Sequence, residues 1–177
     1  MFALSVSELE KLLKGLVIIS SAPDSSWIAE SINTIKKYNL PDVSKAIKKM
    51  NDEPTDNNLK LLFYECIPYL FEPNQIAAGK VILEQNQYNI MTRLWGHNIF
   101  HPQFKYQWIP DKLPTLIIGS SSDKTLPMLL FTRAKEFQKS NIKMVDLQDV
   151  GHYPWLAKFD EISNLMLEFM VLVANKS

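Results

Sequence analysis

Two short loops of this sequence carry side chains that could move a proton. One loop, Gly119 to Pro127, contains a single carboxylate, Asp123. The other, Asp149 to Leu156, contains His152. A histidine paired with a carboxylate acts as a general base, because the carboxylate fixes the imidazole tautomer and stabilises the imidazolium that forms. The two loops therefore predict an acid–base pair, provided that the fold brings them together.

Each of these residues also has a simpler structural explanation. Asp123 stands shortly before Pro127, where a carboxylate could cap the first turn of a helix. His152 stands in a Gly-containing turn, where its ring could be bonded to the backbone. The two residues each follow a predicted strand, so parallel strands could present both at one edge of a sheet.

Three segments are predicted to be the strands that position these loops. The runs Leu16–Ser20 and Leu113–Gly119 are apolar without alternation, which is typical of parallel strands buried on both faces. The third strand is predicted at Ile142–Leu147. Segments with helical spacing lie around them, at residues 2–14, 127–139 and 160–174. This order predicts an α/β fold with parallel strands and flanking helices, in which ligands gather at the carboxyl ends of the strands.

A helical insertion is predicted between the first two strands. Residues 24–108 contain helix-like segments separated by prolines and by a polar stretch, with no convincing strand among them. We therefore expect a core made of residues 1–23 and 109–177, with residues 24–108 as a helical cap.

The two loops resemble the acid loop and the histidine loop of the α/β-hydrolase superfamily. The resemblance covers the strand that runs into Ser-Ser-Ser-Asp123-Lys and the sequence Gly151-His-Tyr-Pro-Trp-Leu156. It implies a partial α/β-hydrolase fold with a cap, in which Asp123 orients His152. The cap and the second motif are most similar to the branch with proline iminopeptidases and small esterases. One departure is Ser120, where the family usually has glycine, so we expect a slightly different turn.

The serine nucleophile of that superfamily is missing from the sequence. The family places it in a Gly-x-Ser-x-Gly elbow, and the five glycines here include no such pair around a serine. The segment that starts at Met1 resembles the part of the family just after the elbow. The resemblance therefore places the missing serine about four residues before Met1. Without it, and without the earlier strands, we expect the chain alone to be inactive.

Aromatic residues are the candidates for binding a substrate. Tyr153 and Trp155 flank His152 in the sequence, and Trp27 and Trp95 belong to the cap, which in the resembling family covers the site. Most aromatic residues of the cap are expected to pack internally, because aromatic side chains at helical spacing usually do.

No metal and no cofactor are expected. His97 and His101 lie four residues apart, a spacing that could hold a metal on a helix, but Gly96 and Pro102 favour a loop there. The single cysteine, Cys66, can form neither an intrachain disulfide nor a zinc cluster.

The composition of the chain limits the classes of partner that we expect it to bind. Lys and Arg total 19, as do Asp and Glu, so no charge excess favours nucleic acid. No apolar run approaches the roughly 20 residues that cross a bilayer, and no signal peptide is recognisable at the start. We expect a cytoplasmic protein with a small-molecule substrate and no membrane or nucleic-acid partner. The exposed edge of the first strand should associate with an identical copy or with a missing N-terminal part.

Three functional hypotheses follow. The first is the C-terminal part of a serine hydrolase that acts on an ester, amide or similar acyl bond. The second is a catalytically inactive, truncated hydrolase that serves as a binding or oligomerisation module. The third is an unrelated α/β binding domain, which predicts that Asp123 and His152 lie far apart.

Overall fold

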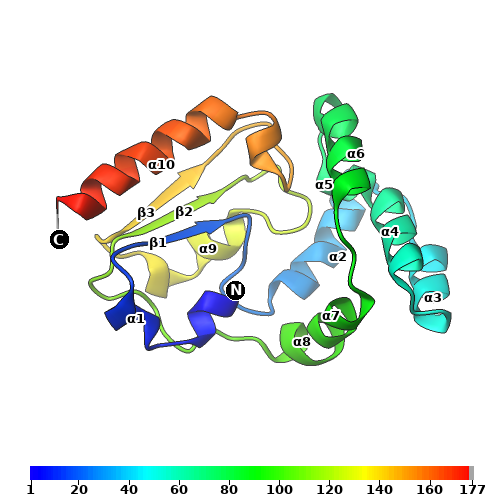
Figure 1. Ribbon diagram of the computed structural model, residues 1–177, viewed down its shortest axis with the longest axis horizontal. Coiled ribbons are helices and arrows are strands. Elements are labelled where there is room, and N and C mark those ends of the chain that lie inside the picture. Colours follow the sequence, from blue (N-terminus) through cyan, green and yellow to red (C-terminus); the bar gives the residue numbers. More distant parts are fainter. Residues whose placement is uncertain (176–177) are drawn as a thin grey trace.

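The computed structural model describes residues 1–175 and contains one parallel sheet (Figure 1). Its strands are β1 (Leu16–Ile19), β2 (Thr115–Gly119) and β3 (Ile142–Asp146), in the spatial order β1-β2-β3. Leu16 pairs with Thr115, and Thr115 pairs with Ile142. The predicted α/β class with parallel strands and flanking helices is therefore confirmed.

Helices cover both faces of this sheet. The helices of the core are α1 (Leu9–Leu12), α9 (Leu129–Arg133) and α10 (Phe159–Ala174), together with the 3-10 turns η1 (Phe2–Ser5), η4 (Lys135–Phe137) and η5 (Pro154–Leu156). Helix α10 runs along one face of the sheet, while α9 and the N-terminal turns lie on the other (Figure 1). The side chains of consecutive residues of the central strand β2 point alternately to these two faces, as the pleat of a strand requires.

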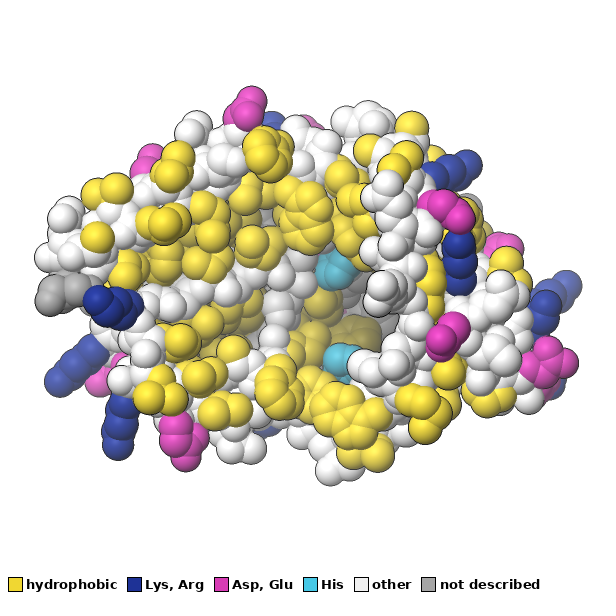
Figure 2. Space-filling model, in the orientation of Figure 1, with side chains coloured by type: hydrophobic (Ala, Val, Ile, Leu, Met, Phe, Trp, Pro, Cys, Tyr) yellow, Lys and Arg dark blue, Asp and Glu magenta, His cyan; other side chains and the backbone are white. Residues whose placement is uncertain are grey.

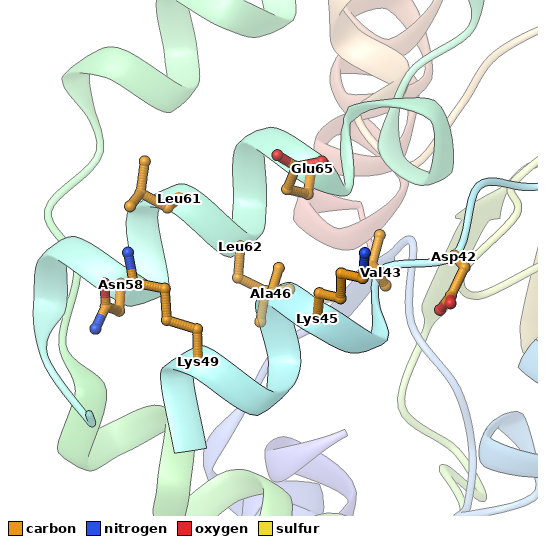
Figure 3. Close-up of a pocket in the computed structure, with 9 residues that line it drawn as sticks. All are labelled: Asp42, Val43, Lys45, Ala46, Lys49, Asn58, Leu61, Leu62 and Glu65. Carbon is orange, nitrogen blue, oxygen red and sulfur yellow. The ribbon is translucent and has the colours of Figure 1, made fainter. Parts of the chain in front are cut away.

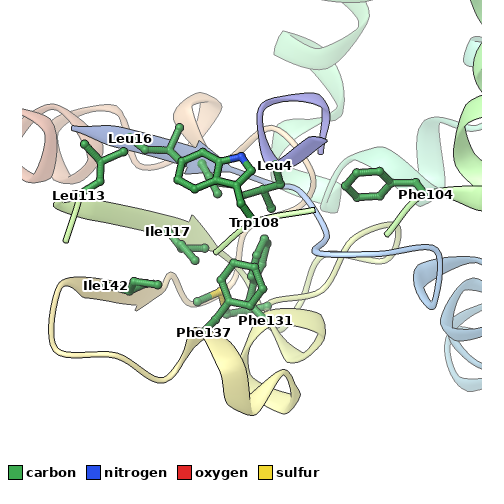
Figure 4. Packing of buried hydrophobic residues seen from close by; sticks show 11 residues of the cluster. Leu4, Leu16, Phe104, Trp108, Leu113, Ile117, Phe131, Phe137 and Ile142 are labelled. Atoms are coloured by element: carbon green, nitrogen blue, oxygen red, sulfur yellow. The ribbon is translucent and has the colours of Figure 1, made fainter. Parts of the chain in front are cut away.

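The larger core cluster lies on the α9 face (Figure 4). Ile117 of β2 packs there with Phe131 and Phe137, and Trp108 closes the cluster by donating its indole N–H to the Ala3 carbonyl at 2.9 Å. The opposite face buries Leu116 under α10. Both faces of β2 are thus fully covered, which explains its unbroken apolar run.

The segment between β1 and β2, called the cap below, consists of helices and helical turns joined by loops. Its helices are α2 (Trp27–Tyr38), α3 (Ser44–Asp52), α4 (Asp56–Glu65), α5 (Ile67–Leu70), η2 (Pro73–Gln75), α6 (Ile76–Gln85), α7 (Ile90–Trp95), the π-helical turn η3 (Gly96–Phe100) and α8 (His101–Gln103). The two ends of the segment meet, because Asp24 forms an antiparallel bridge with Lys105 and the Ser25 amide donates to the Phe104 carbonyl at 2.9 Å. The cap therefore leaves and rejoins the core at one place, beside the carboxyl ends of the strands (Figure 1).

Three local predictions were wrong in detail. The predicted helix 127–139 is only α9, because Ala134 adopts an extended conformation and a short 3-10 turn follows. The predicted helix 2–14 is likewise broken, by extended backbone at Val6. Residues 96–103 are helical rather than a loop, since Pro102 sits in the first turn of α8, where a missing amide costs little.

Candidate active site

The acid loop is a compact turn at the carboxyl end of β2. The Ser120 carbonyl accepts the amides of Asp123 at 3.2 Å and of Met128 at 3.0 Å, so the chain folds back within a few residues. The Ser120 hydroxyl accepts the Ser122 amide at 3.0 Å. Serine at this position, where glycine was the family expectation, therefore adds a hydrogen bond to the turn. Ser121 ties the loop to β3 through its amide, which donates to Asp146 at 2.7 Å.

The two carboxylate oxygens of Asp123 have different partners. Oδ1 accepts the amides of Thr125 at 2.8 Å and Leu126 at 3.0 Å, as well as the Thr125 hydroxyl at 2.7 Å. Oδ2 lies 2.9 Å from Nδ1 of His152. Turn capping and pairing with histidine, which the sequence presented as alternatives, therefore coexist on one side chain. The hypothesis of a chance occurrence in distant loops is contradicted by this contact.

The environment of Asp123 keeps it ionised. The residue is 2% exposed, and burial by itself raises the pKa of a carboxyl group. Hydrogen bonding and the charge of His152, together with the Leu126 amide and the Thr125 hydroxyl, outweigh burial and hold the pKa of Asp123 below its ordinary value of 3.8. An ionised carboxylate only accepts hydrogen bonds, so Nδ1 of His152 carries a proton and donates a hydrogen bond to Oδ2.

The histidine loop follows β3 and is held by the cap. Asp149 turns the chain with a left-handed φ of 57°, a conformation that Asp tolerates better than most residues. The His152 amide then donates to the Leu70 carbonyl at 2.9 Å, and the Gly151 amide donates to Gln75 Oε1 at 3.0 Å. Sequence reasoning missed both cap partners. Nothing in the sequence around Gln75 marks it as a partner of a loop 76 residues away.

Two of the predicted substrate-binding residues lie beside the pair. The Tyr153 ring meets the His152 ring edge-on at 5.5 Å, and Trp155 meets Tyr153 at 5.3 Å. Trp155 remains 39% exposed. Tyr153 also contacts the cap through Phe71, with ring centroids 5.1 Å apart. The pair thus has an aromatic wall on the side of the histidine loop.

The other two candidates belong to a separate aromatic group in the cap. Trp27 packs edge-on against His101 at 5.4 Å, and Trp95 stacks on Phe100 at 5.2 Å. Phe100 joins these contacts, 5.4 Å from His101. Histidine side chains reach the surface beside a hollow in the face drawn in Figure 2. The predicted residues therefore form two groups, one in the histidine loop and one in the cap.

One surface pocket of the cap lies apart from the pair. It has a volume of about 390 Å³ and lies between α3 and α4 (Figure 3). Its lining comes from cap residues alone: Asp42, Val43, Lys45, Ala46, Lys49, Asn58, Leu61, Leu62 and Glu65. Because no residue of the acid loop or the histidine loop lines it, we assign it no part in the site.

Residues 1–175 contain no group of three His, Cys, Asp or Glu side chains placed to hold a metal ion. In the same residues no helix is long and apolar enough to cross a membrane.

The parallel sheet with its flanking helices matches part of the α/β-hydrolase fold, and similar solved structures are hydrolases. An alpha/beta fold family hydrolase from Bacillus anthracis str. Sterne matches 92% of this chain with a TM-score of 0.67 and 13% identity. A thermophilic esterase from Thermogutta terrifontis matches 94% with a TM-score of 0.55 and 14% identity. MGS-M2, an alpha/beta hydrolase from a Medee basin deep-sea metagenome library, matches 88% with a TM-score of 0.50 and 17% identity.

These likenesses concern the fold. The chain spans 60%, 58% and 55% of the three solved chains, so each of them has a substantial part with no counterpart here. No protein-family model matches the sequence, and no curated protein matches it.

Proposed function

We propose that the chain is the C-terminal part of a serine hydrolase that acts on an ester, amide or similar acyl bond. The observation that carries the proposal is the 2.9 Å contact between Asp123 Oδ2 and His152 Nδ1 at the ends of neighbouring parallel strands. In this proposal the serine belongs to a segment N-terminal to Met1. The helical cap and the Gly151–Leu156 motif favour the branch with proline iminopeptidases and small esterases.

The pair has the properties that the reaction needs. Nε2 of His152 makes no hydrogen bond within residues 1–175, and the side chain is 24% exposed, so this nitrogen is available to a nucleophile. It would take the serine proton as the oxygen bonds to the acyl carbon, and would return that proton to the leaving group as the acyl bond breaks. Water would then release the acyl group by the same two transfers. Asp123 stabilises the imidazolium present in between.

The position of Met1 supports this place for the serine. Its amino group donates to the Ser21 hydroxyl at 2.9 Å, just beyond the carboxyl end of β1. The N-terminus therefore lies near the carboxyl ends of the strands, the edge of the sheet at which the acid and histidine loops also stand (Figure 1). A residue shortly before Met1 would enter at the edge where His152 is presented.

The free side of β1 supports a partner for the sheet. In residues 1–175, β1 pairs only with β2. The start of β1 adjoins an open apolar groove of about 480 Å³ beside α10, lined in part by Val17, Met166 and Met170. Hydrophobic side chains gather on this part of the surface (Figure 2). An apolar strand edge is normally paired or covered. We propose that a parallel strand of the N-terminal part covers it.

Turnover of a nitrophenyl ester tests the proposed reaction. The 177-residue chain is expected to show none, whereas a version extended upstream through a Gly-x-Ser-x-Gly segment should hydrolyse the ester. His152→Ala in the extended chain should lower the rate by about three orders of magnitude or more, while His97→Ala, in the cap, should leave it unchanged. Activity of the short chain that depends on His152 would contradict the proposal, and Ser21 and Ser122 would then be the first serines to replace.

A second candidate function is a non-catalytic binding or oligomerisation module. It is favoured by the absence of the elbow from the sequence together with the open edge of β1. Sedimentation of the chain with and without a separately produced N-terminal segment distinguishes the two. Self-association that this segment does not displace supports the module, and a one-to-one complex that gains esterase activity supports the hydrolase.

A further inference from the structure

A buried amide of the cap reaches across to the histidine loop. Gln75, the last residue of η2, is 2% exposed, although its side chain is a polar amide. Its Oε1 accepts the Glu72 amide at 3.0 Å, which closes the turn η2, and the same oxygen accepts the Gly151 amide at 3.0 Å. Its Nε2 donates to the Tyr153 carbonyl at 3.4 Å. The side chain therefore bonds the residues on both sides of His152.

The backbone contact beside Gln75 is unusually close. A Cβ at Gly151 would stand 2.5 Å from the Leu70 carbonyl oxygen and 3.1 Å from the Phe71 Cα, so only glycine lets the two segments approach this far. The Leu70 carbonyl also accepts the His152 amide. The backbone of the histidine loop is thus bonded before, at and after the histidine, in each case by residues of the segment 70–75.

The same cap segment also reaches the acid loop. Lys124, next to Asp123, forms an ion pair with Glu72 at 2.9 Å, and both side chains are largely shielded from solvent. The segment from Leu70 to Gln75 therefore contacts both loops of the pair. Its geometry can set the relative placement of Asp123 and His152.

We propose that Gln75 is a positioning residue for His152, so that the conformation of the cap decides whether the imidazole faces Asp123 correctly. This inference rests on the proposed function, in which His152 is the base. A shift of η2 away from the histidine loop removes the acceptor of the Gly151 amide and the donor to the Tyr153 carbonyl together. The loop then loses the contacts that hold the ring at 2.9 Å from Asp123. A substrate that moves the cap would thereby change how the His152 imidazole is oriented toward Asp123.

The test compares two buried amides of the cap in the 177-residue chain. Gln75→Met removes both hydrogen bonds to the histidine loop with little change in shape. Asn58→Leu is the matched control, because Asn58 is a similarly buried amide whose side chain bonds only Glu53 within the cap. The readout is nitrogen-15 NMR of the His152 imidazole, in which exchange of the Nδ1 proton with water reports its bond to Asp123.

We expect Nδ1 proton exchange about tenfold faster in Gln75→Met, and unchanged in Asn58→Leu even where that variant is less stable. Gln75→Glu keeps an acceptor for the Gly151 amide and should retain slow exchange of that amide. A folded Gln75→Met variant whose Nδ1 proton and Gly151 amide exchange as in the parent chain would overturn the proposal.

Hydrogen exchange of the unaltered chain decides the matter if the variants do not fold. The Gly151 and His152 amides should then be protected to the same degree as the cap helices, while the exposed Asp149 amide exchanges freely. Equal, rapid exchange of all three amides would refute the role of Gln75. Turnover plays no part in these measurements, so an inactive extended chain would count against the proposed hydrolase and not against this positioning role.

Discussion

The acid loop and the histidine loop meet at one pair of atoms but are built in opposite ways. The acid loop is held mainly by its own residues, since the Asp123 carboxylate and the Ser120 carbonyl accept hydrogen bonds from within the following eight positions. Asp146 of β3 and Glu72 of the cap add one contact each, to Ser121 and Lys124. The histidine loop is held from outside, by Leu70 and Gln75 of the cap. The carboxylate is therefore placed by local sequence, whereas the histidine is placed by tertiary contacts that depend on the cap.

The largest effect is expected from removing the centre of the locally built loop. Asp123→Ala leaves the Thr125 and Leu126 amides and the His152 Nδ1 proton without their acceptor in a buried site, so we expect a loss of about 3–5 kcal/mol of unfolding free energy. Urea unfolding measures it. Asp146→Ala is the comparison: it removes the exposed acceptor on β3 to which Ser121 of the acid loop donates, and it should cost only about 1 kcal/mol. Equal losses in the two variants would contradict the central role of Asp123.

A substitution at the contact between the histidine loop and the cap should come next. Gly151→Ala places a methyl group 2.5 Å from the Leu70 carbonyl, a backbone atom that cannot simply rotate away. We expect a loss of about 2–3 kcal/mol by urea unfolding, with weaker protection of the His152 amide. Gly96→Ala is the control, because its methyl group would meet only the movable His101 ring at 3.3 Å. A neutral Gly151→Ala would show that the contact tolerates displacement.

Acid should weaken the contact between Asp123 and His152 and so lower the stability of the folded chain. The loss should be smaller than in the two variants above, because a protonated carboxyl keeps some of its hydrogen bonds. The pKa of Asp123 in the folded chain lies below its ordinary value of 3.8, so the unfolded chain binds the proton first as the pH falls. The stability that the carboxylate contributes is present above about pH 4 and is lost as the pH falls through the folded-state pKa. The stability difference between the parent chain and Asp123→Asn should therefore shrink below about pH 4. A difference that is constant with pH would rule this out.

The smallest effect is expected within the acid loop itself. Thr125→Val removes the hydroxyl that donates to Asp123 Oδ1 at 2.7 Å but keeps the backbone amide on the same oxygen. We expect a loss of about 1 kcal/mol in thermal or urea unfolding. The His152 Nδ1 resonance should not move, since Oδ2 is untouched. A change in that resonance would mean that the two carboxylate oxygens are coupled more tightly than their separate partners suggest.

This contrast also explains what the sequence could predict. The strands follow from local patterns, namely apolar runs that end in short polar loops. The pairing of Asp123 with His152 was predicted from the likeness of their loops to those of α/β-hydrolases and from the common edge at which parallel strands end. The final helix was expected at residues 160–174 and is α10, which begins one residue earlier at Phe159.

The remaining features depend on contacts between distant segments. Gln75 has the sequence surroundings of an ordinary turn residue, and only the fold shows that it faces Gly151. The break after α9 is similar, because Phe131 and Phe137 both turn into the core cluster from separate short elements rather than from one helix face. No periodicity in a single sequence encodes such contacts.

The junction at Asp24 and Lys105 has a consequence for how this chain can change. The two ends of the cap are bonded to each other. The connection between β1 and β2 is therefore closed at this junction, and the cap residues between Asp24 and Lys105 form a loop that starts and ends there. Loop-closure entropy grows only slowly with length, by about 0.6 kcal/mol for each doubling. Residues can thus be gained, lost or exchanged between those positions with little effect on the pairing of the strands. The cap is in this sense a replaceable cassette, and the segment from Leu70 to Gln75 is the part of it that a replacement must preserve.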